Sequence, residues 1–214
     1  MFASFNPPRL PKDKLIITLI DTKFNFNNSD FCYNLGQELL DKLKSCSMLR
    51  RKSLVCNLFI NSHEKQLICP MLKFPEKKNV VLWPSIKLPY RKYPVYVYIY
   101  GAAMYLTSKI SMREAALKVR QKFGLESFSH STLSRILRKL SLNILELLSI
   151  ADLSSPPTDS SPPLIERTRW SVFQTSICKK LLLVIHPVLK KDNEIKFSST
   201  LNYNFFNRTQ KFLI

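Results

Sequence analysis

Apolar and polar positions alternate with a helical period in the middle of the chain. After Ser111, apolar side chains recur at the spacing of one helical face: Met112, Ala115, Ala116, Val119 and Phe123. Ser111 is placed to cap the start of this helix, with Glu114 at the capping-box position. Gly124 stands where the helix is expected to stop. The pattern predicts an amphipathic helix between Ser111 and Gly124.

A second amphipathic helix is predicted to begin near Ser129 to Ser131, where hydroxyl side chains are available as caps. Its apolar stripe consists of Leu133, Ile136, Leu137 and Leu140. Its opposite side carries only hydroxyl groups and cations: Ser131, Thr132, Ser134, Arg135, Arg138 and Lys139. Hydroxyl groups can bind phosphates and arginine can bind the edge of a guanine, so this side suits DNA. An ordinary helical hairpin with a basic, solvated surface would show the same periodicity.

The sequence on either side predicts a buried helix and a four-part organisation. The apolar run over residues 93–106 is shorter than the ~20 residues that span a bilayer, so we expect a core helix there and no membrane partner. Residues 14–26 have the β-branched content of a strand, residues 30–45 have helical spacing, and residues 53–74 suggest two short strands turning at 61–64. The predicted parts are an α+β region (1–90), a helix-turn-helix region (91–150), a Ser/Pro linker (151–168) and a poorly ordered tail (169–214). The expected fold class is mainly α.

Charge points to an anionic partner. The chain of 214 residues has a formal net charge of +18, and such a surplus favours nucleic acid because each neutralised phosphate releases a counterion. From Lys87 to Lys139 there are eleven Lys or Arg residues against two acids, Glu114 and Glu126. A biased composition rich in Lys, Asn, Ile and Phe is an alternative source of part of this charge.

Catalytic chemistry is not predicted. Three glycines are too few for a phosphate-cradling loop, and the acids after residue 140 are too sparse for a two-metal nuclease site. The three histidines are too scattered for a convincing triad. We therefore expect no enzyme activity, no cofactor and no small-molecule substrate. The first residues lack the apolar core of a secretory signal, so a cytoplasmic location with reduced cysteines is expected.

The stretch from Ser111 to Leu140 resembles the helix-turn-helix of bacterial transposases and related mobile-element proteins. Ser111, Met112, Arg113, Glu114 and Ala116 match the first part of that pattern, and Ser129, Ser131, Thr132, Leu133, Arg135 and Leu137 match the second. The resemblance implies that the second helix is the recognition helix. The turn of this chain is longer than the usual 3–4 residues. The predicted DNA-binding residues are Arg113, Ser129, His130, Ser131, Thr132, Ser134, Arg135, Arg138 and Lys139.

The segment before residue 95 resembles the joint between a zinc ribbon and a helix-turn-helix in transposase-like proteins of Firmicutes. Those proteins carry Cys-x-x-Cys pairs, whereas Cys46, Cys56, His63 and Cys69 have no such spacing, so we expect either a degenerate ribbon or plain buried cysteines, and no metal site is predicted. The expected function is specific or semi-specific binding of duplex DNA without a catalytic domain of its own, with a homodimer left open. The alternatives are a helical module that binds an acidic protein or an anionic membrane surface, and a decayed fragment without function.

Overall fold

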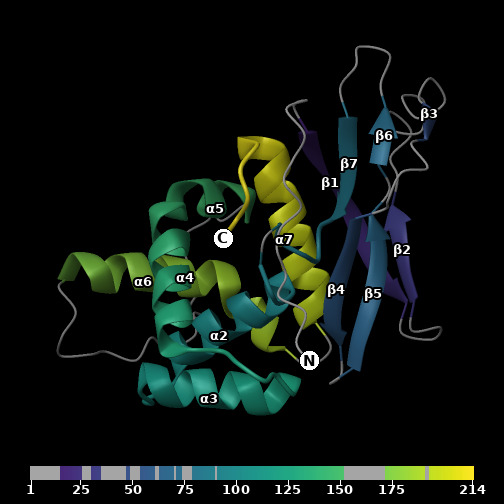
Figure 1. Cartoon of the computed structure of the whole chain (residues 1–214). Helices are drawn as coiled ribbons and strands as arrows, with labels where there is room; N and C mark the ends of the chain where they lie inside the picture. The colour runs from purple at the N-terminus through teal and green to yellow at the C-terminus, as the bar shows by residue number, and fades with distance from the viewer. Residues whose placement is uncertain are drawn as a thin grey trace.

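The computed structural model describes residues 15–25, 30–34, 47–48, 54–60, 63–69, 71–73, 79–89, 91–151, 172–190 and 193–214. Strands lie on one side of the molecule and most helices on the other, and the last helix, α7, lies between them (Figure 1). Within these residues no helix combines the length and the apolar character needed to cross a membrane.

The N-terminal part of the described chain is a mixed β structure. A five-stranded sheet has the order β2-β1-β7-β6-β3, in which β1 and β7 run parallel and the other neighbours are antiparallel. Strands β4 and β5 form a separate antiparallel hairpin. The strands are β1 (Leu15–Asn25), β2 (Asp30–Asn34), β3 (Ser47–Met48), β4 (Leu54–Ile60), β5 (His63–Cys69), β6 (Met71–Lys73) and β7 (Asn79–Pro84).

The C-terminal part of the described chain is helical. Helix α2 is apolar around its circumference, and ten of its 13 residues are buried. It contacts α3, α4, α6 and α7, so it forms the centre of the helical cluster. The helices are α2 (Val95–Thr107), α3 (Met112–Phe123), α4 (His130–Leu142), α5 (Ile144–Ile150), α6 (Val172–Ile185), the 3₁₀ helix η1 (His186–Leu189) and α7 (Glu194–Thr209).

Gly101 allows the helices to approach α2 closely. A Cβ atom at this position would lie 3.2 Å from Val119 Cγ2 of α3 and 3.5 Å from Leu133 Cδ1 of α4. Because glycine has no side chain at this position, α3 and α4 can both pack against the same turn of α2.

Helix α7 joins the helical cluster to the sheet, because it packs against both α2 and β1. Its buried contacts are partly polar: Asn202 Nδ2 donates a hydrogen bond to the Ser85 carbonyl oxygen at 2.7 Å, and the hydroxyls of Ser85 and Ser199 share another. Phe205 is 1% exposed. Buried polar groups that have hydrogen-bond partners hold a helix in one position, in addition to the stability that comes from burying its apolar side chains.

The mainly α fold class is confirmed. The strand over residues 14–26 and the hairpin over residues 53–74 also agree with prediction. The structure corrects two expectations. Residues 30–34 pair with β1 as a strand instead of beginning a helix, because β1 offers an edge to which they can hydrogen-bond. In the region expected to be a poorly ordered tail, α6, η1 and α7 are ordered by the apolar surface that they bury on α2 and α5. The Ser/Pro linker lies outside the described residues apart from Ala151.

Candidate nucleic-acid interface

Helix α3 begins and ends at the residues that the sequence predicts. The Ser111 hydroxyl accepts a hydrogen bond from the Glu114 backbone N–H at 3.1 Å. Gly124 closes the helix in the left-handed conformation, with φ of 61°, where a Cβ atom would be strained. Ala115, Ala116 and Val119 are buried.

Helix α4 has the same kind of start. The Ser129 hydroxyl accepts a hydrogen bond from the Thr132 backbone N–H at 3.1 Å and also lies within hydrogen-bond distance of the Ser131 and Thr132 hydroxyls. The predicted apolar stripe packs inward, with Leu133, Ile136 and Leu140 buried and Leu137 partly buried. Helix α4 rises across α3 and contacts α2, α3 and α6 (Figure 1).

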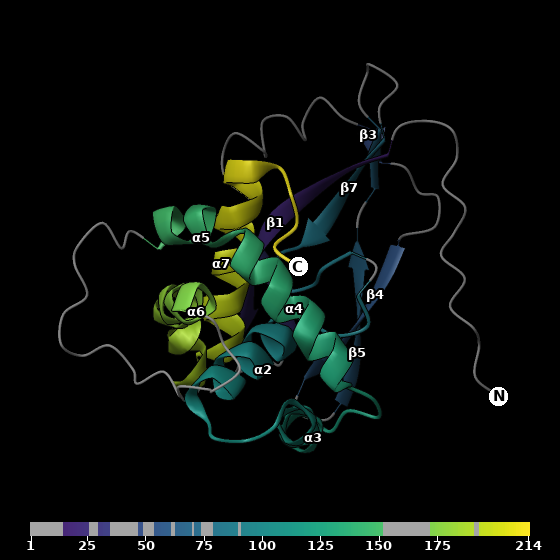
Figure 2. The same ribbon diagram turned by 90° about the vertical axis from the view of Figure 1, so that its left-hand side faces the viewer.

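The outer face of α4 is open to solvent and basic. Ser131, Ser134, Arg135, Arg138 and Lys139 are all exposed. In Figure 2 α4 runs in front of α2 with no other element over it. Within the described residues, none of the three cations of α4 forms an ion pair. This face therefore keeps its full positive charge.

The turn between α3 and α4 spans Gly124 to Ser129 and is longer than that of a compact helix-turn-helix. Its extra residues are anchored, because Leu125 and Phe128 are both 6% exposed and belong to the core. The Tyr93 hydroxyl accepts a hydrogen bond from the Ser127 backbone N–H at 3.2 Å. The additional residues of the turn are therefore packed into the core, and this packing holds α4 in place relative to α3.

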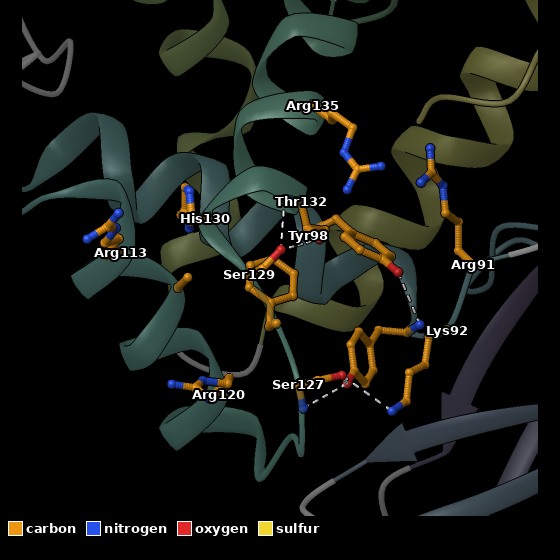
Figure 3. Close-up of a pocket in the computed structure, with 13 residues that line it drawn as sticks. Arg91, Lys92, Tyr98, Arg113, Arg120, Ser127, Ser129, His130, Thr132 and Arg135 are labelled. Carbon is orange, nitrogen blue, oxygen red and sulfur yellow. Dashed lines mark hydrogen bonds between the residues drawn. The ribbon is translucent and has the colours of Figure 1, made fainter.

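A groove of about 590 Å³ lies beside the start of α4. Figure 3 shows its cations in two groups, with Arg113 and Arg120 on one side, near His130, and Arg91, Lys92 and Arg135 on the other. Among the described residues, no carboxylate lines it. The remaining lining residues are Tyr93, Tyr98, Ala116, Ser127, Phe128, Ser129 and Thr132.

The charges in this groove are poorly compensated by the protein. Lys92 Nζ lies 3.3 Å from Glu126 Oε2, in a pair that is exposed on both sides. Burial acts to lower the pKa of Lys92, but Tyr93 and Glu126 outweigh it and raise the pKa. Burial raises the pKa of Tyr98, so this phenol stays neutral. Arg120 Nε is buried and has no hydrogen-bond partner among the described residues.

The predicted site residues divide into three groups. Arg113, Ser129, His130, Thr132 and Arg135 line the groove. Lys139 lines a second hollow of about 510 Å³ that it shares with Arg91 and Lys211. Ser131, Ser134 and Arg138 line neither hollow and form an exposed stripe of α4, at i, i+3 and i+7.

Sequence reasoning missed Arg91, Lys92 and Arg120. Arg120 follows Arg113 by seven residues on α3, a spacing that places both on one helical face and could have indicated it. Arg91 and Lys92 lie in a non-helical segment, and no local pattern indicates that this segment comes beside α4.

The hairpin β4–β5 separates two of the cysteine and histidine positions considered for zinc. His63 and Cys69 are at opposite ends of β5, and a rise of about 3.3 Å per residue puts their Cα atoms about 20 Å apart. They cannot ligate one metal ion. The Cys46 position lies outside the described residues.

A scan against protein-family models finds no match for this chain, and searches of the curated proteins and of the solved structures find no significant similarity.

Proposed function

We propose that this chain binds duplex DNA in the cytoplasm by inserting helix α4 into the major groove. The observation that carries the proposal is the outer face of α4, where exposed hydroxyl groups and cations without an ion-pair partner among the described residues lie on a helix whose other side is seated on α2 and α3. A helix fits the major groove, where each base pair presents a distinct hydrogen-bonding pattern. A basic helix seated on two other helices is one of the arrangements that present a helix to the major groove.

The stripe of Ser131, Ser134 and Arg138 is the part of α4 that would meet base edges. It is exposed to solvent, and Arg138 can bind the O6 and N7 atoms of a guanine with two hydrogen bonds. Arg135 and Lys139 lie at the edge of α4 nearer Arg91 and would meet phosphates. The resemblance to transposase helix-turn-helix segments adds a mobile-element origin to the proposal, with binding but no strand transfer by this chain.

Selection of bound sequences from random duplex DNA, followed by anisotropy titration of the selected site, tests the proposal. We expect one enriched motif. The double variant Arg135→Ala, Arg138→Ala should lose about 1–3 kcal/mol of binding free energy per base-contacting arginine. The matched control is Lys179→Ala, Lys180→Ala, which removes the same charge from exposed positions of α6 and should retain nearly full affinity at physiological salt.

Equal losses in the two double variants would show that net charge alone drives binding. Full binding by the α4 double variant would show that α4 is not the reading helix. Binding to anionic vesicles in preference to duplex DNA would favour the alternative of a membrane-surface module.

A further inference from the structure

The groove beside the start of α4 extends the charged surface well beyond the recognition helix. Its cations come from three separate stretches of chain: the segment before α2, the helix α3 and the first turns of α4. Five of its thirteen lining residues are Arg or Lys, and none is acidic. Folding brings these like charges together, where they repel one another, and an anion bound in the groove would reduce this electrostatic repulsion.

The polar groups of the groove that are not cationic are already used within the protein. The Tyr98 hydroxyl accepts a hydrogen bond from the Tyr93 backbone N–H at 3.2 Å. The Tyr93 hydroxyl is occupied by Ser127, and the Ser129 hydroxyl caps α4. Four arginines line the groove, so guanidinium groups supply most of its N–H donors, and these suit the oxygens of phosphates.

The groove is also shaped for an extended anion. Figure 3 places Arg113 and Arg120 on one bank and Arg91 and Arg135 on the other, with Tyr98 and Ser129 between them. Arg91 also lines the second hollow, together with Lys139 and Lys211, so positive charge continues past the groove along the edge of α4. A single small anion would use only part of this track.

We propose that the groove holds the sugar-phosphate backbone of one DNA strand, with Arg91 and Arg120 as positioning residues that fix the register of α4 in the major groove. This inference rests on the proposed function, since it needs a duplex engaged by α4. It adds a binding site built from residues outside the recognition helix, because Arg91, Arg113 and Arg120 all line the groove.

The test compares single variants of the full chain on the selected duplex and on a panel of single-base substitutions in it. Arg91→Gln and Arg120→Gln should each lose roughly tenfold in affinity, uniformly across the panel, and lower the salt slope by about one. Arg91→Lys should restore most of the loss, because it keeps the charge. Arg138→Ala should instead change the order of preference within the panel.

Lys118→Gln is the matched control, because Lys118 lies on α3 outside the groove and pairs with Glu114, and we expect a loss smaller than threefold there. Circular dichroism melting shows which variants are folded, and Arg91→Gln carries the test if Arg120→Gln is unfolded. Full affinity in Arg91→Gln, or a changed base preference, would overturn the inference while leaving the proposed function intact. Absence of duplex binding by the parent chain would overturn both.

Discussion

Helices α3 and α4 have nearly the same length, begin at a serine cap and rest on the same helix, but they use their cations differently. In α3, Lys118 Nζ lies 3.5 Å from Glu114 and Lys122 Nζ lies 2.7 Å from Glu194 of α7. From His130 to Leu142, α4 contains no acidic residue. Its cations have no carboxylate partner within the described residues. Two lysines of α3 are thus paired with carboxylates of the protein, whereas the cations of α4 can still pair with the phosphates of a ligand.

Lys122 shows what a structural cation looks like in this fold. Its Nζ atom lies 4.2 Å from the centre of the Tyr100 ring, in addition to its ion pair with Glu194. Burial acts to lower the pKa of Lys122, but the hydrogen bond to Glu194 and the contacts with Tyr100 raise it above its ordinary value. These contacts link α3 to α7, so this side of α3 contributes to the packing of the helices within the fold.

The largest expected effect is on the free energy of unfolding and concerns the core that α3 and α4 share with α2. Leu133 is fully buried beside Gly101, where α2, α3 and α4 meet. Leu133→Ala should lower the free energy of unfolding by about 2–5 kcal/mol, because it removes buried methyl groups and leaves a cavity. Urea denaturation measures the loss. Leu142→Ala, on the same helix but 75% exposed, should change stability by less than about 0.5 kcal/mol. Similar losses in both variants would contradict the seating of α4 on α2.

Local rules sufficed to predict the two helices and their ends. The Ser111 and Ser129 caps, the Gly124 stop and the buried stripes depend on residues within one or two turns of each other, and the sequence displays these directly. The predicted contact residues of α4 follow from the same periodicity. For this reason their exposure in the structure agrees with the sequence pattern.

Long-range contacts decided the parts that sequence reasoning missed. Residues 30–34 have helical spacing but form β2, because pairing with β1 satisfies their backbone groups. Helix α7 has only a weak apolar stripe and is ordered by burial of Leu201 and Phe205 in the shared core. Arg91 lines the groove because the segment before α2 lies beside α4, and no local sequence pattern predicts this long-range contact.

The caps provide an intermediate effect that sharpens the comparison. Ser111→Ala and Ser129→Ala each remove one side-chain acceptor from a helix start, so each should cost about 1 kcal/mol of stability. Only Ser129 lies in the groove at the start of α4, so only Ser129→Ala should also weaken binding to duplex DNA. Thermal melting and anisotropy titration of both variants check the two parts. Equal losses of DNA affinity would contradict the division of roles between α3 and α4.

The smallest expected effect tests whether Lys122, a cation of α3 that does not line the groove, is structural. Lys122→Met should lower the free energy of unfolding by about 0.5 kcal/mol, a modest value because the Lys122 side chain is 37% exposed and solvent screens the pair. Since the pKa of Lys122 is raised on folding, this contribution is fully present below the unfolded pKa and is lost as the pH rises through the folded value. Arg138→Met is the matched change on α4 and should leave stability within about 0.3 kcal/mol while reducing DNA affinity. Urea denaturation at neutral pH and at pH values above the folded pKa, together with anisotropy titration at neutral pH, measures both. If Lys122→Met weakened DNA binding as much as Arg138→Met without any loss of stability, Lys122 would belong to the DNA-binding surface, and its contrast with the cations of α4 would fail.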